Sequence, residues 1–455
     1  MKINPDVFRM YDIRGIAEKD FPKEFVYTLG RAYATMAGAK GVKAIALGRD
    51  CRKSSDSIFK NLVEGLTEGG VSIYDIGVVH TPAMYWSLFN LPVQGGIMIT
   101  ASHNPPEYNG FKVAIGRATI YGDEIQELRK VMEKGEFVKG NGRIEKREII
   151  EDYISYIVGN IRIPEDSKPL KVVVDGGNGT AGGTGAEVLK RLGQEVIELY
   201  CDMDGSFPNH EADPTVVDNL KDLIAEMKRS GADIGIAYDG DGDRIGVIAK
   251  GGKIIWGDTL LLVFARSILK EKPGATFVSE VKCSQVIYDE IERAGGKAIM
   301  WKTGHSLIKS KMKESGAELA GEMSGHIFFA NRYFGFDDAV YASARLVELL
   351  LKDGKSITRL IADIPQVYNT PEIRMDCPEE KKFAISEKAR VYFADKAKEI
   401  ITVDGVRVIF EDGAWGLIRA SNTQPVLVLR FEAKSEKRRD QIKEEFIGKI
   451  KEWIG

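Results

Sequence analysis

The sequence has few cysteines and no long apolar run, and both absences exclude whole classes of protein. Its four cysteines, Cys51, Cys201, Cys283 and Cys377, lie far apart and lack the spacing of metal ligands. This argues against a disulfide framework or a zinc site and fits a reducing compartment. No apolar run approaches the roughly 20 residues of a membrane-spanning helix, and the N-terminus lacks the pattern of a signal peptide. We therefore expect a cytoplasmic protein without a membrane partner.

Excess charge is also absent. The formal net charge is −3 over 455 residues, with 44% hydrophobic and 29% charged residues. This balance is that of an ordinary globular protein and provides no bulk attraction for nucleic acid, so no nucleic-acid partner is expected. The length exceeds what one hydrophobic core supports and predicts three or four domains. The sequence leaves a homo-oligomer open.

Apolar strands alternate with amphipathic helices over most of the chain, which is typical of βαβ units with a largely parallel sheet. The pattern predicts three α/β units, and from about residue 368 it changes to an α+β unit with an antiparallel sheet. The expected domains are 1–148, 149–252, 253–367 and 368–455. Expected strands include 94–100, 233–238, 245–249, 406–410, 416–419 and 426–431, and expected helices include 54–66, 219–230, 338–351, 383–397 and 434–453.

The stretch Ile-Thr-Ala-Ser-His-Asn-Pro-Pro at 99–106 follows an apolar strand and ends in turn-forming residues. Ser102 is therefore expected on an exposed loop at the carboxyl end of a strand, where open α/β sheets bind ligands. A serine there can act as a nucleophile, with His103 and Lys112 as candidate neighbours. On this stretch alone, an ordinary serine in a proline-stiffened turn is the slightly favoured interpretation.

Three aspartates alternate with two glycines directly after the expected strand 233–238. They are Asp239, Asp241 and Asp243, and mutual repulsion would raise their pKa values unless a cation joined them. Hard divalent cations prefer such oxygen ligands. The EF-hand pattern does not fit, because Arg244 and Lys250 stand where it requires Gly and Glu. The pattern favours a divalent metal site over a solvated acidic turn.

A competing motif lies at 177–182, where Gly-Asn-Gly-Thr-Ala-Gly follows a strand and precedes a helix. It matches the dinucleotide-binding fingerprint, and Asp202 lies roughly twenty residues further on. Asp175 at the end of the strand counts against it, because its charge would face the pyrophosphate. The motif keeps an NAD-dependent dehydrogenase open as an alternative.

Two further loops carry groups that recognise sugar phosphates. Glu322 and Ser324, in the glycine-flanked stretch 321–326, suit adjacent sugar hydroxyls. Between two strands of the last unit, Arg419 is followed by hydroxyls and an amide, which suits a phosphate monoester. Taken alone, the stretch 321–326 is better explained as a plain polar turn, whereas the Arg419 loop fits an ordinary hairpin turn equally well. Arginines and a histidine in loops at 11–15, 48–52 and 302–305 add further candidates.

Together these stretches resemble the α-D-phosphohexomutase superfamily, in its bacterial and archaeal phosphomannomutase/phosphoglucomutase branch. The matching motifs are Thr-Ala-Ser-His-Asn-Pro at 100–105, Asp-Gly-Asp-Gly-Asp-Arg at 239–244, Gly-Glu-Met-Ser-Gly-His at 321–326 and Arg-Ala-Ser-Asn-Thr at 419–423, with Tyr-Asp-Ile-Arg-Gly at 11–15 as a fifth. The first four of these motifs occur in the family's order, one in each domain. The resemblance implies three similar mixed-sheet α/β domains and a smaller C-terminal α+β domain around a central cleft.

The resemblance also implies a role for each residue of the motifs. Ser102 would be the phosphoserine and would complete a Mg²⁺ site with Asp239, Asp241 and Asp243. Lys112 would be the general acid/base, with Arg14 and His305 beside the transferring phosphoryl group. The implied substrate-binding residues are Tyr11, Arg244, Lys282, Gly304, His305, Glu322, Ser324, Arg419, Ser421, Asn422 and Thr423, of which the last four would hold the phosphate that is not transferred.

The implied activity is reversible phosphoryl transfer between the 1- and 6-positions of mannose or glucose phosphate, through a hexose 1,6-bisphosphate that also serves as activator. The sequence does not separate the two sugars. Alternatives are a phosphoglucosamine mutase or another sugar phosphomutase, an enzyme with Asp239 as its nucleophile, and a sugar-phosphate-binding protein without catalysis.

Overall fold

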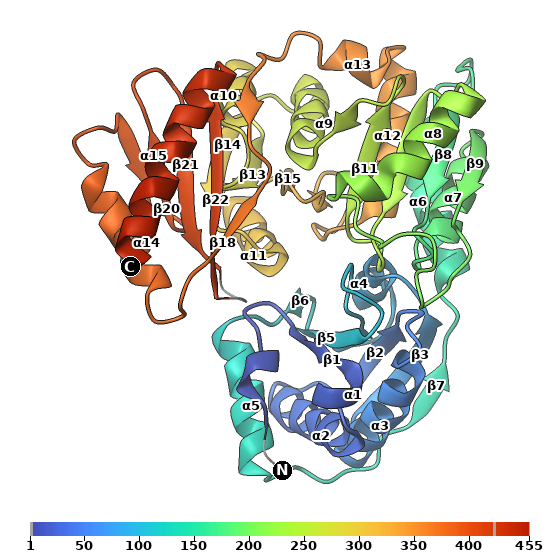
Figure 1. The fold of residues 1–455 in the computed structure, drawn as a ribbon. Coiled ribbons are helices and arrows are strands. Elements are labelled where there is room, and N and C mark those ends of the chain that lie inside the picture. The colour runs from blue at the N-terminus through green and yellow to red at the C-terminus, as the bar shows by residue number, and fades with distance from the viewer. Residues whose placement is uncertain (1–2, 422–424, 455) are drawn as a thin grey trace.

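The computed structural model describes residues 3–421 and 425–454, and within this part the chain forms four β-sheets (Figure 1). Each sheet comes from one continuous stretch of sequence. The first three are mixed sheets with helices packed against them, and the last is antiparallel. The predicted fold class, three similar α/β units followed by a smaller α+β unit, is confirmed.

The strands of the first sheet are β1 (Ile13–Ile16), β2 (Ala44–Arg49), β3 (Ser72–Val78), β4 (Gly95–Ile99), β5 (Tyr108–Ile115), β6 (Ala118–Thr119) and β7 (Ile144–Lys146). The second sheet contains β8 (Lys171–Asp175), β9 (Glu195–Leu199), β10 (Ile234–Tyr238), β11 (Ile245–Ala249) and β12 (Ile254–Ile255). The third contains β13 (Thr276–Glu280), β14 (Lys297–Trp301), β15 (Leu319–Gly321) and β16 (Ile327–Phe329). The fourth contains β17 (Tyr368–Asn369), β18 (Ile373–Asp376), β19 (Glu399–Ile401), β20 (Val406–Ile409), β21 (Trp415–Ala420) and β22 (Val426–Ala433).

The first three sheets share one layout. Three parallel strands lie side by side, in the orders β3-β2-β4, β9-β8-β10 and β14-β13-β15, and an antiparallel strand follows the third of them. That strand is β5, β11 or β16. The units are therefore structural repeats. The second sheet continues through β12 on β11, past the boundary expected at residue 252.

The helices are α1 (Ala17–Asp20), α2 (Lys23–Ala39), α3 (Ser55–Glu68), α4 (Thr81–Asn90), α5 (Asp123–Lys134), α6 (Ile150–Asn160), α7 (Gly182–Arg191), α8 (Lys221–Ser230), α9 (Gly257–Glu271), α10 (Gln285–Arg293), α11 (His305–Ser315), α12 (Ala339–Asp353), α13 (Ile357–Leu360), α14 (Lys382–Tyr392) and α15 (Glu436–Ile454). Short 3₁₀ helices span Pro5–Val7 and Val217–Leu220. Local sequence sets the ends of several. For example, the Asp338 carboxylate accepts from the Tyr341 N–H at the start of α12, and Gly354 ends that helix in the left-handed conformation.

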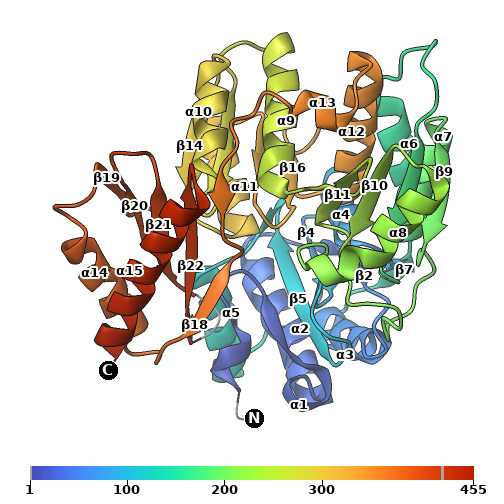
Figure 2. The same cartoon turned by 45° about the horizontal axis from the view of Figure 1, so that its top comes forward.

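Apolar packing joins the first three units more closely than the fourth. One continuous cluster of buried side chains runs from the first unit through the second to the third. The fourth has its own core between its sheet and helices α14 and α15, and a small apolar cluster around Trp415 connects it to the third. Figures 1 and 2 show these two helices beside the sheet of the fourth unit. In the described ranges 3–421 and 425–454, no helix combines the length and apolar character needed to cross a membrane.

Helices α2 and α3 lie side by side in both views of the fold (Figures 1 and 2), and their contact tests this packing. A Cβ at Gly65 of α3 would lie 2.2 Å from the Tyr27 carbonyl oxygen of α2. We expect Gly65→Ala to lower the free energy of unfolding by about 1–3 kcal/mol, since the backbones must separate. Gly38→Ala in α2 is the matched control, because a Cβ there meets no atom within 4 Å. Thermal and denaturant unfolding measure both; equal stabilities would contradict the close approach.

Candidate active site

The predicted motifs occupy equivalent positions in their units. Each forms the loop that carries the chain from the third parallel strand into the antiparallel strand. Residues 100–107 connect β4 to β5, residues 239–244 connect β10 to β11, and residues 322–326 connect β15 to β16. Arg419 and Ala420, the first residues of the predicted phosphate-binding motif, end β21, and the antiparallel β22 is the next strand. The fold thus brings all four loops together.

A cleft of about 940 Å³ collects these loops from all four units. The predicted residues that line it are Tyr11, Arg14, Ser102, Lys112, Asp243, Arg244, Lys282, Gly304, His305, Glu322, Ser324, Arg419 and Ser421. Asp239 and Asp241 lie behind its wall, fully buried. Asn422 and Thr423 lie outside the described residues. The cleft therefore contains nearly the whole predicted constellation.

Ser102 sits at a sharp bend, although not on an exposed loop as expected. Only 3% of its surface is accessible, because the 239–244 loop packs against it; a Cβ on Gly240 would lie 2.4 Å from the Ser102 carbonyl oxygen. Its φ angle of 54° is in the left-handed region, which costs a non-glycine residue free energy. The Ser102 hydroxyl donates to Asp239 Oδ2 at 2.8 Å and lies 3.1 Å from His103 Nδ1.

Asp239, Asp241 and Asp243 converge with oxygens within 4.8 Å of one another. Burial, with repulsion from Asp243 and Asp241, raises the pKa of Asp239 well above its ordinary value. Burial also opposes the charge of Asp243, but Lys112 and His326 outweigh it and hold that pKa below its usual range. The three carboxylates thus oppose one another's charge, and burial and repulsion disfavour the charged form of Asp239.

Lys112 is the cation that reaches this cluster from the first unit. Its ammonium group donates to Asp241 Oδ2 at 2.7 Å and also to Asp243. Burial disfavours its charge, but the two carboxylates outweigh burial and raise the pKa of Lys112 well above its ordinary value. Thr81 adds a hydroxyl donor to Asp241 at 2.5 Å. The first unit therefore supplies both the charge and the hydrogen bonds that hold the acidic loop.

The cluster fits a divalent cation for two reasons: its ligands are carboxylate oxygens, and some of these oxygens have no hydrogen-bond partner. Among the described residues, Asp241 Oδ1 and Asp243 Oδ1 are buried without a hydrogen-bond partner, which is a costly state for a carboxylate. Three carboxylates at one point are the donors that Mg²⁺ prefers. A cation joining Asp239, Asp241 and Asp243 would satisfy these oxygens and remove the repulsion.

Sequence reasoning gave His326 no role, although it ends the 321–326 motif. Its ring lies between Asp243, at 3.6 Å from Nδ1, and Asp337, at 3.1 Å. Burial lowers its affinity for a proton, but the two carboxylates outweigh burial and raise the pKa of His326. The ring of His305 stacks on the ring of His326, with 5.9 Å between the ring centres. Burial, together with the positive charge of Lys309, lowers the pKa of His305 well below its ordinary value. The two histidines therefore favour opposite charge states within one cleft.

The residues that the sequence predicts to bind the sugar are held by partners from neighbouring loops. Glu322 accepts from the Gly304 N–H at 2.7 Å, and its burial beside Glu280 raises its pKa. Lys282 donates to Glu372 at 3.1 Å, which connects the third unit to the start of the fourth. Ser324 is half-buried at the cleft wall. Carboxylate and ammonium groups thus face one another across the site.

Two arginines that line the cleft, Arg419 and Arg14, are also paired. Arg419 Nε lies 2.6 Å from Asp404, whose carboxylate also accepts from the Thr303 N–H at 3.0 Å. Arg14 donates to Asp12 at 2.5 Å and to Asn104 Oδ1 at 2.7 Å. Asp404 and Asn104 were not singled out from the sequence, because a carboxylate or amide in a loop carries no signal of its spatial partner.

The competing glycine motif at 177–182 has a packing role. A Cβ at Gly179 would lie 2.7 Å from the Gly240 carbonyl oxygen, and one at Gly182 would lie 2.9 Å from Cys201 Cα. The Thr180 N–H also donates to that Gly240 oxygen at 3.1 Å. The space that a pyrophosphate would need is filled by protein backbone, so these glycines support the acidic loop.

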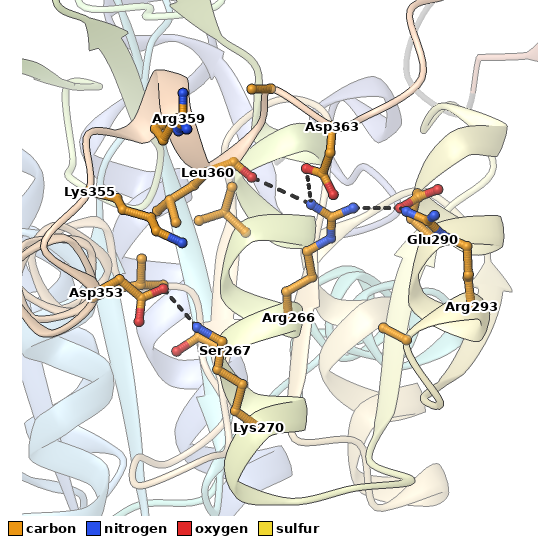
Figure 3. Close-up of a pocket in the computed structure, with 14 residues that line it drawn as sticks. Arg266, Ser267, Lys270, Glu290, Arg293, Asp353, Lys355, Arg359, Leu360 and Asp363 are labelled. Atoms are coloured by element: carbon orange, nitrogen blue, oxygen red, sulfur yellow. Dashed lines mark hydrogen bonds and ion pairs between the residues drawn. The ribbon is translucent and has the colours of Figure 1, made fainter.

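A second pocket, of about 660 Å³, lies on the outer face of the third unit (Figure 3). Its lining is rich in charge, but most of that charge is paired internally. Arg266 donates to Asp363 at 2.9 Å and to Glu290 at 2.5 Å, and Lys270 donates to Asp353 at 2.7 Å. It contains none of the predicted motifs. The chemistry of this protein therefore belongs to the larger cleft.

Comparison with known proteins identifies one group of relatives. Family models described as phosphoglucomutase/phosphomannomutase match in order: α/β/α domain I over residues 5–139, domain II over 151–252, domain III over 256–368 and the C-terminal domain over 372–449. A phosphomannomutase/phosphoglucomutase of Pseudomonas putida is 46% identical over 97% of this chain and 95% of its own length. A phosphoglucomutase of Neisseria meningitidis is 45% identical over 97% of this chain and 96% of its own.

A solved structure shows the same likeness in three dimensions. The X-ray structure of a phosphoglucomutase/phosphomannomutase family protein from Burkholderia thailandensis aligns with a TM-score of 0.93 at 41% identity. The alignment covers 99% of this chain and 98% of that one. The likeness therefore includes the arrangement of all four units.

The acidic cluster predicts a stabilising response to Mg²⁺ that needs no substrate. We expect Mg²⁺ at 100 times its dissociation constant to stabilise the folded protein by about 2.7 kcal/mol, because the cation binds only the assembled site. Asp241→Asn should remove most of this shift. Glu211→Gln is the control, since it removes a carboxylate from the same cleft outside the cluster. Thermal unfolding with and without Mg²⁺ measures this. An undiminished shift in Asp241→Asn would remove Asp241 from the ligand set.

Proposed function

The chain belongs to the phosphoglucomutase/phosphomannomutase family, and from this we propose that it transfers a phosphoryl group reversibly between the 1- and 6-positions of hexose phosphates. The protein is thus an intramolecular phosphotransferase, classed with the isomerases. The proposed substrate is glucose or mannose phosphate. A phosphoglucosamine mutase is less well supported, since the relatives at 45–46% identity are named for glucose and mannose phosphates.

One observation carries the catalytic proposal: the Ser102 hydroxyl faces the cleft while donating to a carboxylate of the acidic cluster at 2.8 Å. A serine needs a neighbouring proton acceptor to become a nucleophile, and Asp239 occupies that position. Asp239 itself is fully buried, and its Oδ1 accepts from the N–H groups of Asp243 and Arg244. This geometry favours Ser102 over Asp239 as the nucleophile.

We propose Mg²⁺ as the cation, held by Asp239, Asp241, Asp243 and the phosphorylated Ser102. When bound, it would neutralise negative charge on the transferring phosphoryl group, which is the main requirement of phosphoryl transfer. Lys112 is charged in the folded protein and borders the cleft beside these carboxylates. Its positive charge therefore suits it to stabilise negative charge on the transferring group, and we propose it as the general acid/base of the reaction.

The reaction then uses one centre twice. A sugar hydroxyl bonds to phosphorus as the bond between Ser102 Oγ and phosphorus breaks, which gives a hexose 1,6-bisphosphate. The proton that the sugar hydroxyl loses is replaced on the Ser102 oxygen through Lys112, the proposed acid/base group, which takes up one proton and gives up another. This intermediate turns over in the cleft, and its other phosphate returns to Ser102. Arg14 and His305 line the cleft and would lie beside the transferring group, and Tyr11, Arg244, Lys282 and Gly304 also line the cleft. Glu322 and Ser324 would read sugar hydroxyls, while Arg419, Ser421, Asn422 and Thr423 would hold the phosphate that stays.

We propose that the four domains divide near residues 148, 252 and 367. The continuity of each sheet in sequence supports this division, with β12 marking the least sharp of the three boundaries. The cytoplasmic location and a homo-oligomeric state stay predictions.

Replacing the nucleophile tests the serine mechanism. We expect Ser102→Ala to lower kcat for conversion of glucose 1-phosphate by about 10⁴-fold or more, as loss of other catalytic serines does. Ser206→Ala is the control, because it removes a hydroxyl from a loop of the second unit. A coupled assay for glucose 6-phosphate measures turnover, and mass mapping should find the phosphate of the wild type on the Ser102 peptide. Retained turnover in Ser102→Ala would disprove the serine mechanism.

Removing the guanidinium of Arg419 tests the proposed phosphate-binding loop. Arg419→Ala should raise KM by the loss of a charge-assisted hydrogen bond, about 1.5–3 kcal/mol. Arg438→Ala in the same domain is the control, since that side chain pairs with Asp412 at the surface. Steady-state kinetics with glucose 1-phosphate measure both variants. An unchanged KM in Arg419→Ala would place the distal phosphate elsewhere.

A further inference from the structure

The loop that carries Ser102 contains stored strain, and something must hold it in place. Ser102 adopts φ 54°, and a non-glycine residue keeps such a conformation only when its surroundings determine it. The carbonyl groups of this loop point inward, away from the cleft. Their hydrogen bonds lead to a side chain that the proposed mechanism does not use.

That side chain is Arg52, from the loop after β2. Its Nη2 donates to the carbonyl oxygens of Ser102 at 2.8 Å and Asn104 at 2.5 Å. Its Nη1 donates to those of Pro105 at 2.6 Å and Tyr108 at 3.2 Å. The side chain is fully buried and does not line the cleft. It therefore contacts the loop from behind and reaches no substrate.

The fifth N–H of Arg52 anchors it to its own loop. Nε donates to Asp50 Oδ2 at 3.1 Å, so each of the five donors of a guanidinium has an acceptor. Asp50 is fixed in turn by the Ser55 hydroxyl at 2.6 Å, and its N–H donates to the Ile99 carbonyl at the end of β4. Phe207 of the second unit covers the guanidinium, with its ring centre 5.0 Å from Arg52 Cζ. The arginine is thus a rigid part of the scaffold.

We propose that Arg52 is a positioning residue that holds the strained Ser102 loop in the conformation that transfers the phosphoryl group. Phosphoryl transfer depends on alignment of the attacking and leaving oxygens, so small displacements of Ser102 Oγ reduce the rate strongly. A planar, five-donor guanidinium can bridge four carbonyl groups, whereas a lysine ammonium has three donors and no fork. The proposal rests on the proposed function for its kinetic part only.

Arg52→Lys tests this proposal while keeping the charge. We expect kcat for glucose 1-phosphate to fall by about 10- to 100-fold because the loop is misaligned. The KM should stay within about twofold, because the residues that bind the sugar and distal phosphate are unchanged. Arg49→Lys is the matched control: it removes a guanidinium from the end of β2, directly before the Arg52 loop, but one that pairs with Asp56 and Asp75. It should keep wild-type kcat.

Hydrogen exchange provides a readout that does not require turnover. In Arg52→Lys, the amides of residues 100–110 should exchange faster than in the wild type, while those of β22 remain unchanged. Should Arg52→Lys fail to fold, Asp50→Asn keeps the side-chain volume and weakens the anchor, and it should change exchange and kcat in the same direction. Wild-type exchange over 100–110 in a folded variant, or a KM that rises as kcat falls, would overturn the proposal. If the wild-type protein has no mutase activity, the proposed function is refuted instead, and hydrogen exchange alone then tests whether Arg52 positions the loop.

Discussion

The site depends on compensating three buried carboxylates at one point. Two like charges about 4 Å apart repel by roughly 4 kcal/mol at an effective dielectric constant of 20, and Asp239, Asp241 and Asp243 lie this close. Lys112 offsets part of that repulsion through its contacts with Asp241 and Asp243. Because Lys112 belongs to the first unit and the carboxylates belong to the second, the charge balance exists only when the two are packed together. The same packing brings Ser102 to Asp239.

The repeated fold explains why one centre can draw on several units. Each α/β unit places a loop where its third parallel strand is followed by an antiparallel neighbour, and these loops carry, in turn, the proposed nucleophile, the acidic cluster and the proposed sugar-binding residues. The bridge between Arg244 and His326 pairs the second and third of them directly. A shared apolar cluster fixes the three units relative to one another. The same strand–loop–strand arrangement, present in three units, therefore forms one composite site.

Much of this site could be predicted because its residues follow strands in recognisable motifs. The acidic repeat after β10 is recognised by the alternation of aspartate and glycine, and the serine after β4 by the turn-forming residues that follow it. Residues that act through distant partners carry no such signal. His326 meets Asp337 and Asp243 only in space, and Arg52 receives its role from carbonyl groups some fifty positions later. The expected exposure of Ser102 was wrong for the same reason, because the covering loop comes from another unit.

The pairing of the cleft residues with one another explains how one site can serve both ends of a sugar. Arg419 is held by Asp404, so a ligand must offer more than a single carboxylate to replace that contact, and a phosphate dianion does. A hexose bisphosphate carries such a group at each end. In the proposed mechanism the arginine would then hold whichever phosphate is distal, without distinguishing the 1-position from the 6-position. That indifference is what a mutase needs, because the nucleophile remains in one place while the substrate reverses its direction.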